Sequence, residues 1–149
     1  MKVVVDTNIV FSTLLNTNSR LANLLLQTHP LVHFYTCDYL RSELLRHRPK
    51  LLKLTKLPEM ALTELQSLVT GRISFINEGL LPAAVFRQAE ALTHTIDPDD
   101  TPFVALALHL DALLWTGDLR LHHGLQRQQF ANAITTAELA QRIDDLWNG

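Results

Sequence analysis

The segment VVVDTNIVFSTLL, residues 3–15, opens with consecutive valines and reaches its first carboxylate at Asp6. A short run of β-branched residues predicts a strand that is apolar on both faces, as in a parallel sheet covered by helices on each side. Short apolar segments of this kind alternate with helical segments along the rest of the chain. The alternation predicts an α/β fold, a single-domain α/β/α sandwich with a mainly parallel central sheet of about five strands.

The boundaries of the expected elements follow from apolar runs, capping residues and prolines. Strands are expected at residues 3–5, 33–37, 72–77, 112–116 and 130–135. Helices are expected at residues 20–27, 39–48, 59–69, 83–94 and 135–147, with another that starts at Pro98 and a short polar one between the fourth and fifth strands. Ser19 and Asp38 are expected helix caps, and Thr135 and Glu138 have the spacing of a capping box.

The composition limits the class of protein. The 149 residues, 47% of them hydrophobic, suffice for one domain with a substantial core. The formal net charge of −2 gives no overall basic signal for nucleic-acid binding. Cys37 is the single cysteine, so an internal disulfide is excluded, and its apolar surroundings predict a packed, unreactive thiol. With no signal peptide and no apolar run of membrane-spanning length, we expect a soluble cytoplasmic protein.

Several carboxylates stand next to elements that meet at one edge of the predicted sheet. Asp6 follows the first strand, and Asp118 follows the fourth. Glu43 lies in the helix after the second strand, within reach of the same edge. Before the helix that leads into the fourth strand stand Asp97, Asp99 and Asp100. Ligands of open parallel sheets bind beyond the carboxyl ends of the strands, so four distant segments direct acids toward a ligand position.

Each acid also has an ordinary structural explanation. Asp97 suits the N-cap of a helix that Pro98 begins. Asp6 can cap the helix that follows it, and Asp118 can be a turn residue. Glu43 can pair on the surface with Arg46 or His47 at helical spacing. Taken together, crowded carboxylates repel one another and raise one another's pKa, so the cluster is unfavourable without a cation. Oxygen-preferring Mg²⁺ or Mn²⁺ is the expected occupant, and such a site is suited to hydrolysis of phosphodiesters.

A basic segment surrounds Glu43 in the sequence. Its members are Arg41, Arg46, Arg48 and Lys50, followed by Lys53 and Lys56. Such a segment can follow the phosphates of a nucleic acid, or it can form a solvated helix face whose long side chains cover apolar surface. The sequence leaves these two interpretations open. The adjacent His122 and His123 do not share a helix face, so we expect them in solvent or against RNA rather than on zinc.

Four motifs in this order resemble those of the PIN domain family, and the resemblance covers essentially the whole chain. VVVDTNIVFSTLL resembles the opening motif, with Asp6 as its acid and Asn8 as a residue that helps to hold the loop. SELL resembles the second motif and carries Glu43, and DTPFVALAL resembles the third, which selects Asp100. WTGD resembles the fourth motif and ends on Asp118.

The resemblance implies a Mg²⁺- or Mn²⁺-dependent ribonuclease, in bacteria commonly the toxin of a VapC-type toxin–antitoxin pair and usually a homodimer. RNA is the implied substrate, and a cognate antitoxin protein is the implied partner. The principal metal carboxylates by this resemblance are Asp6, Asp100 and Asp118. Glu43 completes the acidic quartet, and Thr116 supports it or binds a metal-linked water. The DPDD sequence resembles one subgroup of small prokaryotic PIN proteins, which makes Asp99 a secondary site residue.

Two other α/β protein classes fail at specific positions. A haloacid-dehalogenase-type phosphatase needs a second Asp two residues after the first, where this sequence has Asn8. A response-regulator receiver needs an Asp after the third strand and a Lys after the fifth, where this sequence has Asn77 and no lysine beyond Lys56. Two alternatives remain: a non-catalytic PIN-like module that binds RNA or protein, and an RNA-processing nuclease without an antitoxin.

Overall fold

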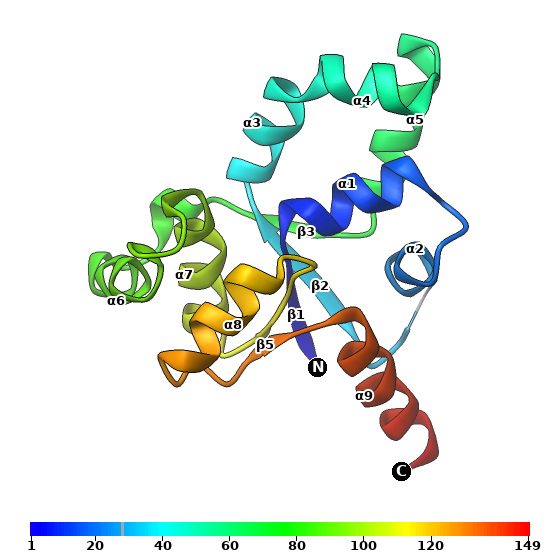
Figure 1. Cartoon of the computed structure of the whole chain (residues 1–149). Coiled ribbons are helices and arrows are strands. Elements are labelled where there is room, and N and C mark those ends of the chain that lie inside the picture. The colour runs from blue at the N-terminus through cyan, green and yellow to red at the C-terminus, as the bar shows by residue number, and fades with distance from the viewer. Residues whose placement is uncertain (28) are drawn as a thin grey trace.

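The computed structural model describes residues 1–27 and 29–149, and within them a five-stranded sheet forms the centre of the molecule (Figure 1). Its strands are β1 (Lys2–Val5), β2 (His33–Cys37), β3 (Ser74–Ile76), β4 (Leu113–Trp115) and β5 (Ala133–Ile134). The strand order is β3-β2-β1-β4-β5, and every adjacent pair is parallel. The expected parallel α/β sheet is confirmed.

Helices connect the strands and cover the sheet on both sides. Those between β1 and β3 are α1 (Thr7–Leu15), α2 (Arg20–Leu26), α3 (Tyr39–Arg46), α4 (Arg48–Thr55) and α5 (Glu59–Thr70). Those after β3 are α6 (Ala83–Thr93), α7 (Thr101–Leu110), α8 (Leu119–Arg127) and α9 (Thr136–Asn148). Helix α7 packs on β1, β2 and β4, and Figure 1 shows α6 and α7 on the side of the strands opposite to α1 and α2. The chain therefore forms three layers.

The central strands are buried on both faces, as consecutive apolar residues predict. Val3, Val4 and Val5 have no exposed surface, and neither has Trp115 in β4. Val5 pairs in register with Trp115. The residues that follow these two therefore leave the sheet side by side at its carboxyl edge, between the two strands where the chain order reverses.

Two predicted helix boundaries are wrong. The helix expected over 39–48 is two helices, α3 and α4, and Pro49 lies in the first turn of α4 rather than beyond a helix end. Proline is accepted there because the N–H groups of a first turn have no intrahelical acceptor. The α-helix expected from Pro98 begins at Thr101, after the 3₁₀ turn η2 (Pro98–Asp100). Asp100 therefore stands at the start of α7 rather than within its first turn.

Most of the predicted caps are confirmed. The side chain of Ser19 accepts from Ala22 N, and Thr135 and Glu138 form the complete capping box of α9. Asp38 stands at the start of α3 but makes no capping hydrogen bond. Cys37 is fully buried, and burial raises the pKa of its thiol, as expected of a packed side chain. Across the described residues, no helix has the length and apolar character that crossing a bilayer requires.

Candidate active site

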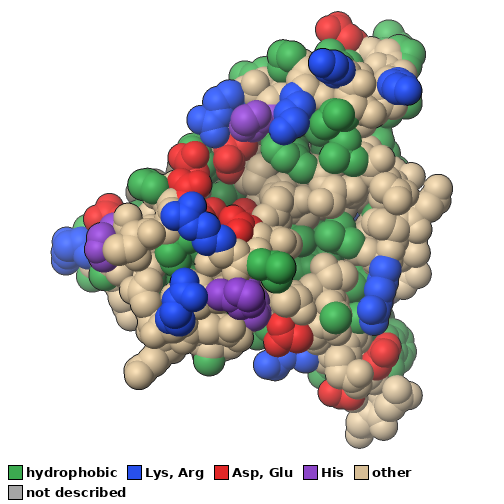
Figure 2. Space-filling model, viewed as in Figure 1, with side chains coloured by type: hydrophobic (Ala, Val, Ile, Leu, Met, Phe, Trp, Pro, Cys, Tyr) green, Lys and Arg blue, Asp and Glu red, His purple; other side chains and the backbone are tan. Residues whose placement is uncertain are grey.

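A hollow of about 160 Å³ lies at the carboxyl edge of the sheet beside β1. The residues that line it are Asp6, Thr7, Asn8, Phe11, Glu43, Asp97, Asp99 and Asp100. Asp118 adjoins the hollow, because its charge acts on both Asp6 and Asp100. Figure 2 shows acidic side chains gathered near the middle of one face of the molecule, with basic side chains close to them. The fold thus brings together the acids of four distant segments.

Asp6 is the most deeply buried of these acids, with 5% of its surface exposed. It stands at the N-terminus of α1, where its Oδ1 accepts a hydrogen bond from Thr7 N at 2.7 Å. Its Oδ2 accepts from Thr116 Oγ1 at 2.8 Å. Burial raises the pKa of Asp6 from 3.8 to about 6, against these two hydrogen bonds and with a smaller contribution from the charges of Glu43 and Asp118. The two hydrogen bonds hold the carboxylate in place, and it takes up a proton at a higher pH than an ordinary aspartate does.

Thr116 joins the loops that follow β1 and β4. Besides donating to Asp6, its Oγ1 accepts from Asp118 N at 3.0 Å and from Asn8 Nδ2 at 3.4 Å. Asn8 Oδ1 in turn accepts from Gly117 N at 3.1 Å. The side chain of Asp118 caps α8 through hydrogen bonds from the first turn of that helix. The predicted supporting residues Thr116 and Asn8 therefore lie where they orient two of the acids.

Glu43 reaches the hollow from α3. Its Oε1 accepts a hydrogen bond from Thr7 Oγ1 at 2.5 Å, and its Oε2 lies 3.4 Å from Arg46 Nη2. Burial raises the pKa of Glu43, and the charge of Asp99 adds to this, whereas the Thr7 hydroxyl and Arg46 oppose it. Both explanations of Glu43 are therefore correct: it pairs with Arg46 and it lines the site. Thr7 was not identified as a site residue, because nothing marks it in the sequence beyond its place next to Asp6.

The acids of η2 have different surroundings. Asp97 Oδ1 accepts from Asp99 N at 2.9 Å, so Asp97 caps this turn as predicted. Asp99 Oδ1 accepts from Tyr39 Oη at 2.7 Å, and its Oδ2 lies 4.0 Å from Arg46 Nη2. Asp99 therefore connects η2 to α3 through side-chain contacts across the hollow. Tyr39 was not identified from the sequence, since nothing local marks a tyrosine at a helix start as the partner of an acid 60 residues away.

Of these acids, Asp100 is the one whose surroundings most favour a bound ligand. Its Oδ2 is buried and has no hydrogen-bond partner among the described residues. Burial raises the pKa of Asp100 from 3.8 to about 8, and the charges of Asp6, Asp97, Asp118 and Glu43 act in the same direction. A buried carboxylate oxygen without a donor is unfavourable unless something positive approaches it. A positively charged group beside Asp100 would relieve this cost.

The residues fit a hard divalent cation by their chemistry. In residues 1–27 and 29–149, no three His, Cys, Asp or Glu side chains form a ready-made metal cage. Mg²⁺ does not need one, because it is commonly held by one or two carboxylates and completes its shell with water and substrate phosphates. The donors around the hollow are oxygens, and the unpartnered oxygen of Asp100 lies among them. Asp6 and Asp100 both line the hollow, and Asp118 acts on both of them through its charge.

The basic residues predicted to contact substrate are mostly engaged within the protein. The guanidinium of Arg41 lies over the ring of Phe75, 3.7 Å from its centroid. Arg48 donates to a carbonyl and a hydroxyl of α5. Arg46 pairs with acids of the site, and Lys50 is exposed on α4. Of the four, Arg46 reaches the acidic hollow, so the contacts favour a structural helix face over a continuous phosphate track.

One histidine departs from the expectation. His123 is exposed, but His122 is buried, with its Nε2 3.3 Å from Glu138 Oε1. The prediction that both rings lie in solvent or against RNA is therefore wrong for His122. Its ring packs between α8 and the first turn of α9, a contact that depends on how the two helices meet.

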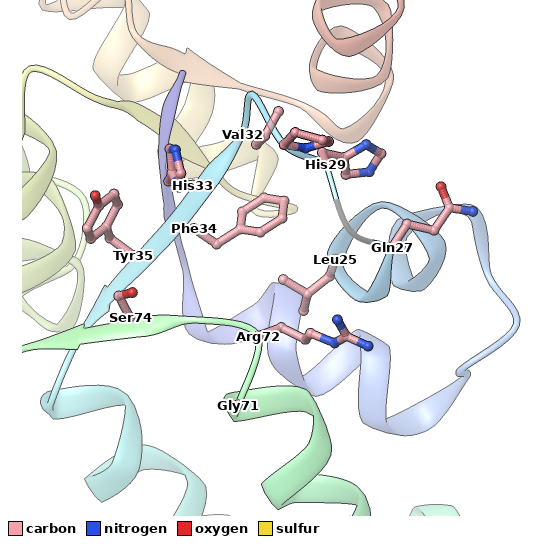
Figure 3. Close-up of a pocket in the computed structure, with 11 residues that line it drawn as sticks. Leu25, Gln27, His29, Val32, His33, Phe34, Tyr35, Gly71, Arg72 and Ser74 are labelled. Atoms are coloured by element: carbon pink, nitrogen blue, oxygen red, sulfur yellow. The ribbon is translucent and has the colours of Figure 1, made fainter.

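A larger hollow of about 410 Å³ lies at the opposite edge of the sheet (Figure 3). It is lined by the first residues of β2, the residues that lead into β3 and the end of α2, including His29, Phe34 and Arg72. The described residues that line it include no carboxylate. It also lies at the amino ends of the strands, away from the edge where ligands of parallel sheets bind. The acidic hollow is the better candidate despite its smaller volume.

Comparison with known proteins agrees with this geometry. No curated protein matches the sequence. The structure of VapBC2 from Rickettsia felis bound to a DNA fragment from their promoter is similar, with 15% identity over 91% of this chain and 97% of that chain and a TM-score of 0.63. The structure of VapBC-1 from nontypeable Haemophilus influenzae is also similar, with 18% identity over 85% of this chain and 94% of that chain and a TM-score of 0.62. These likenesses show a shared fold.

The sequence itself matches the family model of the PIN domain. The match spans residues 4–143 and so includes the acids that surround the hollow. The strand order, the acidic edge and this match agree, and the chain belongs to the PIN domain family.

Proposed function

We propose that this protein is a divalent-metal-dependent endoribonuclease, with residues 1–149 forming a single nuclease domain. The observation that carries the proposal is the unpartnered, buried Oδ2 of Asp100 in a hollow that it shares with Asp6 and Glu43. Strongly raised pKa values at neighbouring acids in a hollow are typical of functional sites. Metal sites that are built from two or more carboxylates serve the hydrolysis of phosphodiesters.

Four acids at the site and one threonine have distinct roles in this proposal. Asp6, Asp100 and Asp118 hold Mg²⁺ or Mn²⁺, which when bound neutralises the acids, binds a phosphate oxygen and makes the attacking water more acidic. Thr116 Oγ1 keeps Asp6 Oδ2 in one orientation. Glu43, whose pKa is raised by burial, accepts a proton from the attacking water.

The test uses purified protein and mixed RNA with Mn²⁺ or with EDTA. Asp6→Asn and Asp118→Asn remove the negative charge but keep helix capping, since asparagine caps as well as aspartate. Asp144→Asn, at an exposed position of α9, is the matched control. We expect cleavage by the wild type and the control with Mn²⁺, and none with EDTA or with the two site variants.

Two results would contradict this proposal. Equal loss of RNA with the wild type and Asp6→Asn would point to a contaminating nuclease. RNA binding by the wild type without cleavage in Mn²⁺ would favour the non-catalytic module.

We also propose that the nuclease is the toxin of a type II toxin–antitoxin pair and forms a homodimer. The sequence resemblance to VapC-type toxins supports this, and so do two similar folds that belong to proteins named VapBC. A short reading frame directly upstream, whose product binds the nuclease and stops cleavage, is the expected finding. Cleavage with no inhibitory partner encoded nearby would favour an RNA-processing nuclease.

A further inference from the structure

A third hollow, of about 210 Å³, lies next to the acidic site along the chain. The residues that line it are Thr95, Ile96, Arg120, Gly124, Arg127 and Gln128. Thr95 and Ile96 lead directly into the acidic turn η2, and Arg120 follows Asp118 by two residues. The hollow therefore lies between the two segments that carry Asp100 and Asp118.

The charge of this hollow is opposite to that of the acidic one. Two arginines line it, and the described residues around it include no carboxylate. Across the part of the chain that the structure describes, the guanidinium groups of Arg120 and Arg127 make no ion pair and no hydrogen bond. Both side chains are exposed. They differ in this from Arg41, Arg46 and Arg48, whose guanidinium groups contact other residues.

The spacing along α8 places the two arginines on the same face. Arg120, Gly124 and Arg127 follow the i, i+4, i+7 pattern, so the guanidinium-bearing residues are roughly 10 Å apart along the helix axis. Gly124 lies between them, and a Cβ at this position would be 2.5 Å from Ile96 Cδ1. Glycine is unfavourable inside a helix compared with alanine. Here it lets α8 pack closely against Ile96, which lines the same hollow as the two arginines.

We propose that Arg120 and Arg127 of α8 bind a backbone phosphate of the RNA that flanks the phosphate at the acidic site. The inference rests on the proposed ribonuclease function and adds to it where the substrate lies. An anionic strand approaching a cluster of acids on a protein of net charge −2 needs cations close to the reacting phosphate. The strand would then run from the edge of β1 and β4 along α8, not along α3 and α4.

The test measures RNA affinity without cleavage. Fluorescence anisotropy of a fluorescein-labelled single-stranded RNA in EDTA compares the wild type with the double variant Arg120→Gln/Arg127→Gln. The control, Arg20→Gln/Arg142→Gln, makes the same charge change at exposed positions of α2 and α9. We expect roughly a tenfold loss of affinity in the α8 variant, and a decrease of about 0.7 in the magnitude of the slope of log K against log salt, the value for one phosphate on a single strand. The control should remain close to the wild type.

A second variant separates a bound phosphate from general attraction. Gly124→Leu pushes the Ile96 side chain aside, because even its Cβ would lie 2.5 Å from Ile96 Cδ1, and so narrows the hollow without changing charge. We expect this variant to weaken RNA binding as well. Gly124→Ala is the milder replacement, and circular dichroism checks the fold of both. If the folded Gly124 variants bind RNA like the wild type, or if the arginine variant binds like its control, the phosphate site is refuted.

Cleavage kinetics in Mn²⁺ distinguish this inference from the proposed function. We expect the α8 arginine variant to have a higher KM with little change in kcat, since no acid is altered. A wild type that cuts RNA while the variant keeps its KM refutes the α8 site alone. A wild type that neither binds nor cuts RNA refutes both proposals. Saturable binding of inorganic phosphate that the double variant loses, with RNA affinity unchanged, would identify a small-anion site and refute the RNA assignment.

Discussion

Replacement of Asp100 with asparagine is expected to stabilise the metal-free protein at neutral pH. Burial, together with the charges of Asp6 and Asp97, raises the pKa of Asp100 from 3.8 to about 8. The folded protein therefore binds this proton more tightly than the unfolded chain. The group costs no stability below pH 3.8, lowers stability as the pH rises from there, and has its full effect above about pH 8.

The size of the effect follows from the pKa difference. One pKa unit corresponds to about 1.4 kcal/mol, and neutral pH lies about three units above 3.8, so Asp100 would lower the free energy of unfolding by about 4 kcal/mol at that pH, where it is mostly protonated in the folded protein. Asp100 keeps some contact with solvent, and screening reduces this figure to roughly 2 kcal/mol. In a domain of this size, such a gain raises the Tm by roughly 4–8 °C.

Thermal unfolding followed by circular dichroism in EDTA measures this gain. We expect Asp100→Asn to melt above the wild type at pH 7 and 8.5, with a smaller gain at pH 5, while the exposed control Asp144→Asn stays unchanged. Added Mn²⁺ should stabilise the wild type more than the variant, because ligand binding to the folded state raises its stability. A variant that melts at or below the wild type in EDTA at pH 7 would refute the idea that the Asp100 carboxyl group lowers the stability of the metal-free protein.

Two further substitutions test the residues that hold the acids. Tyr39→Phe removes the hydroxyl that donates to Asp99. We expect a loss of about 1 kcal/mol in the free energy of unfolding and weaker Mn²⁺ binding by calorimetry. Unchanged Mn²⁺ affinity would show that this contact does not position the site. Thr116→Val removes the donor to Asp6 Oδ2 and the acceptor of Asp118 N. The pKa of Asp6 should therefore rise above about 6. Because more of Asp6 is then protonated at pH 6, kcat/KM should fall more at pH 6 than at pH 8. An unshifted pH profile would argue against this role of the hydroxyl.

The predicted strands and most helices agree with the structure because their signals are local. Consecutive valines mark a strand that is buried on both sides, and Thr135 with Glu138 marks the start of α9. The errors arose where a local signal has two meanings. Pro49 can end one helix or begin the next, and Pro98 opens a 3₁₀ turn as readily as an α-helix.

The candidate site shows the same division. Asp6, Glu43 and Asp118 could be chosen from the sequence because each stands next to an element that ends or passes at the carboxyl edge. The stretch DPDD allowed three acids at its turn, and only their surroundings distinguish them. Asp97 caps the turn, Asp99 bonds to Tyr39, and Asp100 keeps a buried oxygen without a partner.

The sequence by itself determined the alternation of buried strands and helices, and with it the edge at which the acids gather, because burial on both faces and helix starts are encoded in neighbouring residues. The tertiary structure alone decided which groups hold those acids and which arginines remain free. Thr116 reaches Asp6 across 110 residues, and Tyr39 reaches Asp99 across 60. Such contacts depend on the packing of β1 against β4 and of α3 against η2, which no local pattern specifies.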